Sequence, residues 1–157
     1  MKNKMILVLG ANSFNVKVFL NSTERNVYCL VHKEIPKIDR NNIFFINKIS
    51  EVKNLNQIDE ITIINFASSY NSRKNIISLI SSNFLKLFME VVKSNRIDIV
   101  NIINIGSYWQ NSDSSFRKPY TIVKNFSDYV FIKLYKSVNY INLKIGDVID
   151  IDDERDK

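Results

Sequence analysis

Short apolar runs rich in β-branched residues, separated by stretches with helical spacing, constrain the fold of this chain most. Six such runs predict buried strands, at Met5–Leu9, Val27–Val31, Ile43–Ile46, Ile61–Phe66, Ile99–Ile105 and Ile141–Ile145. Helices are predicted between them, over Phe14–Asn21, over the apolar residues spaced by three and four between Ile76 and Val91, and from about Tyr120 to Lys136. Continuously apolar strands that alternate with helices are typical of a parallel sheet covered on both faces. We therefore expect an α/β fold with about six parallel strands in three αβα layers.

The length and composition fit one domain with one core. The chain has 157 residues, of which 45% are hydrophobic and 24% charged, as in ordinary globular proteins. We expect a single domain over residues 1–157. No apolar run approaches the length that spans a bilayer, and the first run ends at Gly10, too early for a signal peptide. These features predict a cytoplasmic protein with no membrane partner.

The cysteine count and the net charge limit the kinds of site and the function classes that remain open. Cys29 is the only cysteine and there is one histidine, so an internal disulfide and a zinc site of the usual type are excluded. Cys29 lies in the apolar run VYCLV and is expected to be a buried thiol. The net charge of +6 leaves a nucleic-acid-binding α/β domain as an alternative, but the basic residues are scattered rather than gathered into a stripe. We expect no nucleic-acid partner.

The turn after the first strand is the place where an open parallel sheet binds phosphates. Its sequence is LGANSFNV, in which Gly10 fits the first position of a G-x-x-G-x-x-G pattern, while Ser13 and Val16 occupy the other two. Gly10 and Ser13 are predicted to lie beside a cofactor phosphate, where Ser13 offers a hydroxyl and an N–H. The alternative is an ordinary strand–helix connection.

Two basic residues, His32 and Lys33, follow the second strand. An acidic residue at that place binds the ribose hydroxyls of NAD, whereas a basic one suits the additional phosphate of NADP. The pair therefore favours NADP over NAD, unless both residues are simply solvated.

A tyrosine and a lysine four residues apart on a helix can transfer a proton to or from a carbonyl oxygen. Free tyrosine has a pKa near 10, and a nearby ammonium group lowers it by stabilising the phenolate. The chain contains four such pairs, Tyr70/Lys74, Tyr120/Lys124, Tyr129/Lys133 and Tyr140/Lys144. The first falls in a polar loop, the last falls on a predicted strand, and the third lies about half a rotation round the helix from the second. Only Tyr120 begins a helix after a strand that leads to a hydroxyl residue, Ser107. The trio Ser107, Tyr120 and Lys124 is the predicted catalytic site; the alternative is a coincidental loop serine and a surface pair.

The stretches INIGSYWQN (residues 103–111) and PYTIVK (residues 119–124) resemble extended short-chain dehydrogenases of the NAD-dependent epimerase/dehydratase family. Within that family they are most similar to reductases of CDP- or dTDP-linked 4-keto-6-deoxyhexoses (the CDP-abequose/paratose synthase type), in which a hydroxyl residue precedes a Trp-Gln pair and the catalytic Tyr and Lys. Trp109 and Gln110 match that pair. Three further matches are the turn with Asn12 and Phe14, the segment NFASS with Ala67 and Ser68, and Asn83 in the long helix.

The resemblance implies a Rossmann-like doubly wound fold, lacking most of the C-terminal substrate lobe, that binds NADP or NAD. It implies reduction of a 4-keto-6-deoxyhexose linked to a nucleotide, in surface polysaccharide biosynthesis, and a homodimer formed through the two long helices. Tyr120 would donate the proton, Lys124 would lower the tyrosine pKa and bind the nicotinamide ribose, and Ser107 would hydrogen-bond the carbonyl. The cofactor-binding residues would be Gly10, Asn12, Ser13, Phe14, His32, Lys33, Ala67, Ser68, Asn83 and Lys124. The alternative is a truncated or inactive relative that binds a nucleotide or a partner.

Overall fold

The computed structural model describes residues 3–11, 14–31, 35–66, 99–107, 125, 128–129 and 139–145. In chain order, the elements are β1 (Lys4–Leu9), α1 (Phe14–Ser22), β2 (Val27–Leu30), β3 (Ile43–Ile46), the 3-10 helices η1 (Ile49–Glu51) and η2 (Leu55–Gln57), β4 (Glu60–Asn65), β5 (Ile99–Ser107) and β6 (Asn139–Ile145). The six predicted strands and the first predicted helix are confirmed, and none of their ends differs by more than two residues. One difference concerns the site: Ser107 is the last residue of β5, whereas the sequence placed it just beyond the strand.

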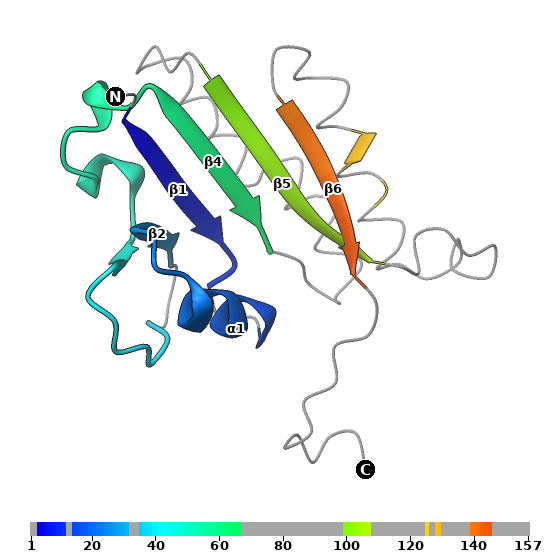
Figure 1. Ribbon diagram of the computed structural model, residues 1–157, viewed down its shortest axis with the longest axis horizontal. Helices are drawn as coiled ribbons and strands as arrows, with labels where there is room; N and C mark the ends of the chain where they lie inside the picture. The colour runs from blue at the N-terminus through cyan, green and yellow to red at the C-terminus, as the bar shows by residue number, and fades with distance from the viewer. Residues whose placement is uncertain are drawn as a thin grey trace.

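The six strands form one sheet in the order β3-β2-β1-β4-β5-β6, and every neighbouring pair is parallel (Figure 1). This is the strand order of the Rossmann fold, so the predicted α/β class is confirmed. The chain moves outward from β1 through β2 to β3 and then returns to the other side of β1 with β4. The strand order therefore reverses between β1 and β4. In open parallel sheets, ligands bind at such a reversal, beyond the carboxyl ends of the strands.

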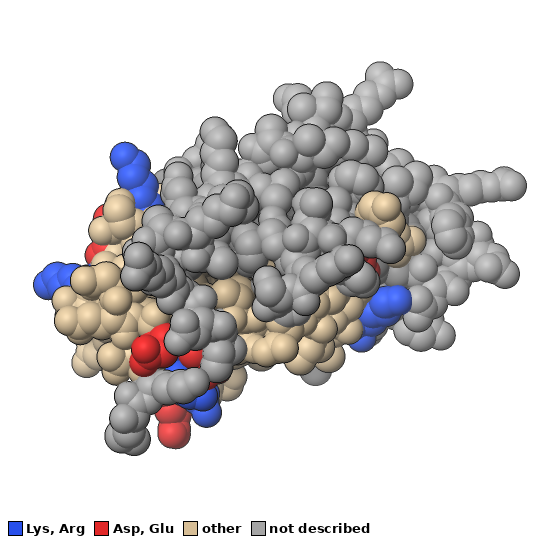
Figure 2. Space-filling view, turned by 90° about the horizontal axis from the view of Figure 1, so that it is seen from above, with Lys and Arg blue, Asp and Glu red and all other residues tan. Residues whose placement is uncertain are grey.

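Basic side chains are scattered over the surface of the described part and do not gather into one patch. Figure 2 shows Lys and Arg at separate places on one face, with Asp and Glu beside some of them. Lys4 Nζ forms an ion pair with Glu60 Oε2 at 2.9 Å, between neighbouring strands. No helix among the described residues is long and apolar enough to cross a membrane.

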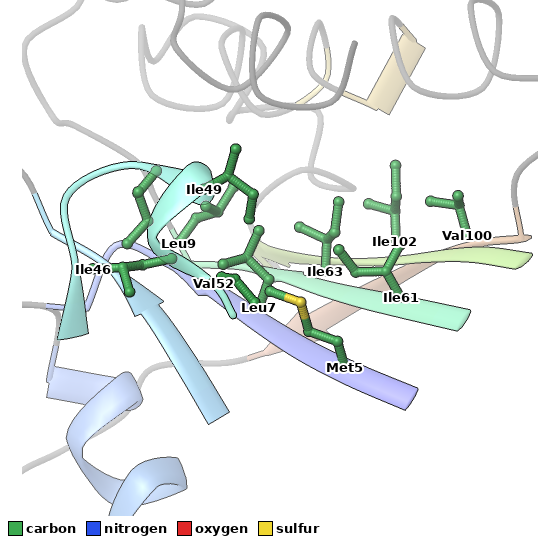
Figure 3. Close-up of a cluster of buried hydrophobic side chains, with 11 residues drawn as sticks. Met5, Leu7, Leu9, Ile46, Ile49, Val52, Ile61, Ile63, Val100 and Ile102 are labelled. Carbon is green, nitrogen blue, oxygen red and sulfur yellow. The ribbon is translucent and has the colours of Figure 1, made fainter. Parts of the chain in front are cut away.

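Apolar side chains cover both faces of the sheet. On one face, Leu7, Ile63 and Ile102 are fully buried and lie in direct register on β1, β4 and β5, with Ile49 and Val52 from the η1 region packed against the same cluster. Figure 3 shows these side chains on one side of the strands and α1 on the other. Such alternation follows from the pleat, since successive side chains of a strand point to opposite faces.

The second cluster attaches α1 to the opposite face. Val16 and Leu20 of α1 are fully buried there with Val8 and Cys29. The expectation of a buried thiol is confirmed, and burial raises the pKa of Cys29 to about 12. Val16 stands where a dinucleotide fold has its third glycine, and its side chain fills the space between helix and sheet instead of leaving it open.

Candidate functional site

The turn after β1 begins with a residue in a backbone conformation that favours glycine. Gly10 has φ of 80°, a region in which a residue with a Cβ is disfavoured. The chain turns there from the end of β1 towards α1, while the N–H of Phe66 donates to the carbonyl of Leu9 (3.0 Å) and keeps the end of β4 beside the end of β1. Gly10 has no side chain of its own that would keep a ligand phosphate away from its backbone.

We predict that Gly10→Ala destabilises the protein by about 1–2 kcal/mol, because a Cβ in the left-handed region clashes with the following carbonyl. Urea unfolding would measure this loss of stability. The matched control is Gly106→Ala, which changes the same residue type within β5, where the structure records no positive φ. Equal stability of Gly10→Ala and the wild type would contradict the assigned conformation.

Three of the predicted site residues lie at the carboxyl edge of the sheet. Gly10 follows β1, Phe14 begins α1 and Ser107 ends β5. Ser107 is three residues beyond Asn104, which pairs with the last residue of β4, so β5 extends about 10 Å past that point at ~3.3 Å per residue. The other predicted residues lie outside the described part of the chain: Asn12, Ser13, His32, Lys33, Ala67, Ser68, Asn83, Tyr120 and Lys124.

A row of three asparagines crosses the sheet near the same edge. Asn65 on β4 is in register with Asn104 on β5, which is in register with Asn142 on β6. Asn65 is 8% exposed and Asn104 is 1% exposed. Asn65 Nδ2 donates to Asn104 Oδ1 at 2.9 Å. Buried amides must find partners within the protein, and here the first partner is the neighbouring amide.

The carboxylate of Asp128 receives hydrogen bonds from this row. Asn104 Nδ2 donates to Asp128 Oδ1 at 2.9 Å. The Tyr140 hydroxyl donates to the same oxygen, and Asn142 Nδ2 donates to Oδ2. Hydrogen bonds to an ionised acceptor are about twice as strong as neutral ones. The helical residue Asp128 is thus bound to β5 and β6 by three side chains.

Tyr140 donates to Asp128 in this network and also receives a hydrogen bond from the Asn104 side chain. Burial, the hydrogen bond to Asp128 and the negative charge of that carboxylate raise the pKa of the Tyr140 hydroxyl well above its ordinary value. It therefore stays protonated near neutral pH and cannot serve as a base. Its lysine partner by spacing, Lys144, lies four residues further along β6, which is about 13 Å away on an extended strand. The prediction that Tyr140/Lys144 lies on a strand is confirmed.

The sequence prediction missed Asn104, Asp128, Tyr140 and Asn142 as partners, and used Asn65 only as the start of the segment NFASS. One signal was present: Asn65 and Asn104 interrupt runs of isoleucine that predict buried strands. A polar residue at a buried strand position implies a specific partner. The identity of that partner depends on strand register and on a helix far along the chain.

Solved structures share this fold, although no protein-family model and no curated protein matches the sequence. A short-chain dehydrogenase/reductase from Burkholderia vietnamiensis aligns with 96% of this chain and 86% of its own, with a TM-score of 0.66 and 10% identity. A short-chain dehydrogenase from Burkholderia cenocepacia J2315, solved in complex with NADP, aligns with 94% of this chain and 75% of its own (TM-score 0.61, 16% identity). The Bordetella bronchiseptica enzyme WbmG, solved with NAD and UDP, aligns with 88% of this chain and 52% of its own (TM-score 0.54, 10% identity). At these identities the likeness establishes a shared Rossmann-like fold.

Proposed function

We propose that this chain is an NAD(P)-dependent oxidoreductase of the short-chain dehydrogenase type, formed as one nucleotide-binding domain over residues 1–157. The observation that carries the proposal is the strand reversal between β1 and β4, with the Gly10 turn at its carboxyl edge. In this fold that edge receives the pyrophosphate of a dinucleotide. The solved relative from Burkholderia cenocepacia, which shares the sheet, is a complex with NADP.

The residues of the chain have distinct roles in this proposal. Gly10, Asn12, Ser13 and Phe14 would hold the cofactor phosphates at the first turn. His32 and Lys33, which follow β2, would bind the additional phosphate of NADP. The segment with Ala67 and Ser68 and the side chain of Asn83 would line the nicotinamide half.

The cofactor supplies hydride chemistry, and the protein orients it and handles the proton. Tyr120 donates the proton to the carbonyl oxygen of the substrate. Lys124 lowers the pKa of the Tyr120 hydroxyl and so brings that pKa closer to neutral pH. Ser107, at the end of β5, offers a hydroxyl to the same carbonyl oxygen.

For the substrate we propose a nucleotide-linked 4-keto-6-deoxyhexose of surface polysaccharide synthesis. The support is the run INIGSYWQN followed by PYTIVK, in which Trp109 and Gln110 precede Tyr120 and Lys124. WbmG, which shares the fold, was solved with UDP in addition to NAD. We further propose a cytoplasmic homodimer that associates through the two long predicted helices.

Cofactor binding is the first test. Titration of the protein with NADPH, followed by nicotinamide fluorescence, should saturate at micromolar concentrations, and NADH should bind more weakly. The absence of binding up to millimolar concentrations would exclude the oxidoreductase. Saturable binding without reduction of a 4-keto sugar nucleotide would instead support an inactive nucleotide-binding relative. Affinity for DNA or RNA that falls steeply with salt would favour a nucleic-acid-binding domain.

A further inference from the structure

Side chains from two neighbouring strands donate hydrogen bonds to the Asp128 carboxylate. It accepts from Asn104 on β5 and from Tyr140 and Asn142 on β6. Asn104 is 1% exposed, so water does not compete for its hydrogen bond. Removing one partner of such a buried pair leaves the other with its full desolvation penalty. These hydrogen bonds hold Asp128 at a defined position relative to β5 and β6.

The network continues to β4 with a defined direction. Asn104 Nδ2 donates to Asp128 Oδ1, and Asn104 Oδ1 accepts from Asn65 Nδ2. Because an amide has one donating and one accepting end, the carboxylate determines which way Asn104 faces. Asn104 in turn determines the orientation of Asn65, the last residue of β4.

Each member of this chain of hydrogen bonds lies close in sequence to a proposed site segment. Asn65 precedes Ala67 and Ser68 by two and three residues, and Asn104 precedes Ser107 by three. Asp128 follows Lys124 by four residues and Tyr120 by eight, which is about one and two turns of the helix that the sequence predicts there. The polar network therefore joins the three segments that the proposed function requires to be held together.

We propose that Asp128 is a positioning residue for proton transfer. Its carboxylate, through Asn104 and Asn65, fixes Asp128 relative to the ends of β4 and β5, and with it the helix that the sequence predicts to carry Tyr120 and Lys124. This inference rests on the proposed function for its catalytic consequence. A displacement of about 1 Å of a catalytic group can lower the rate by about 100-fold.

The test compares Asp128→Asn with Glu24→Gln, which removes a carboxylate charge at an exposed site. The Asp128→Asn protein should fold, lose about 100-fold in kcat, and retain its KM for the sugar nucleotide, since the loss is in transition-state stabilisation. Hydrogen exchange should accelerate in peptides from residues 120–136 and stay unchanged in β1. Glu24→Gln should match the wild type in all of these measurements.

The double variant Asn104→Asp/Asp128→Asn provides a rescue. It exchanges carboxylate and amide, so Asn65 can still donate to residue 104, residue 128 can donate to residue 104, and Asn142 can still donate to residue 128. Only Tyr140, which donates to the Asp128 oxygen that faces Asn104, loses its acceptor. We expect this double variant to recover part of the lost kcat and the slow exchange. A double variant no better than Asp128→Asn would overturn the hydrogen-bond mechanism.

A milder substitution keeps the proposal testable if Asp128→Asn does not fold. Asn142→Ala removes one of the three donors from a half-buried position on β6, and should change kcat and exchange in the same direction to a smaller extent. Unchanged exchange over residues 120–136 in a folded variant would overturn the proposal. If the wild type binds no NADPH and reduces no substrate, the proposed function fails, and the exchange measurement alone decides whether Asp128 fixes the helix.

Discussion

Tyr120→Phe should lower kcat for reduction of a 4-keto sugar nucleotide by about 100- to 10,000-fold, the range that general acid–base catalysis contributes. Phenylalanine retains the ring and removes only the hydroxyl that gives up the proton. The NADPH dissociation constant should stay within about twofold, because the proposed role of the hydroxyl is in proton transfer and not in ground-state binding. Steady-state kinetics and a fluorescence titration on the same preparation measure both quantities.

Tyr129 provides the matched control for this substitution, and Tyr140 provides a comparison within the Asp128 network. Tyr129 lies beside Asp128 and is 60% exposed, so Tyr129→Phe should leave kcat and stability unchanged. Tyr140→Phe removes a hydroxyl that donates to Asp128 and should lower stability by about 1–3 kcal/mol without loss of cofactor binding. A Tyr120→Phe protein with the activity of the wild type would show that the proton donor is elsewhere.

The sheet could be predicted from the sequence because each strand carries its own signal. The run MILVL is apolar throughout and the run ITIINF is interrupted only by Thr62 and Asn65, which identifies strands buried on both faces whatever their neighbours are. The exact ends of the strands were harder to predict. β6 begins at Asn139, before its apolar run; Asn139 pairs there with Asn101 of β5, and Asn139 Nδ2 donates to Asn101 Oδ1.

The first turn was predicted in part. Gly10 was expected to begin a phosphate loop; the structure gives it a positive φ, and its contact with a phosphate stays a prediction. Val16 occupies the third glycine position of that pattern. In the structure it is a fully buried member of the cluster between α1 and the sheet. Whether the fold accepts valine at this position depends on the distance between α1 and the sheet, and no local sequence pattern gives that distance.

The polar network could not be predicted because its members are distant in sequence. Asn65 and Asn104 are 39 residues apart, and Asn104 and Asp128 are 24 apart. Each pair forms only when the register of β4, β5 and β6 places the side chains on one face. The sequence indicates that a buried asparagine needs a partner, whereas only the fold identifies Asp128 as that partner. The same limit applies to the catalytic prediction, which selects Tyr120 by its place after a strand.

The largest loss of stability is expected for Ile63→Ala. Ile63 is fully buried at the centre of the sheet, between Leu7 on β1 and Ile102 on β5, both also fully buried. Truncation removes three carbons and leaves a cavity that neighbours on a hydrogen-bonded sheet cannot easily fill. Substitutions of this type cost about 2–5 kcal/mol, a large share of the about 5–15 kcal/mol that stabilises a domain.

Ile141→Ala is the control, because it is the same substitution on the outermost strand. Ile141 lies on β6 and is 56% exposed, so its truncation should change stability by less than about 0.5 kcal/mol. Urea unfolding measures both, and the midpoint should fall for Ile63→Ala with an unchanged m-value, since the same surface is exposed on unfolding. Equal losses for the two variants would contradict a core centred on β1, β4 and β5. A large loss for Ile141→Ala alone would mean that the stabilising contacts lie on the β6 side. The asparagine row lies two residues further along β4 and β5 than Ile63 and Ile102, so this apolar layer also supports the network that holds Asp128.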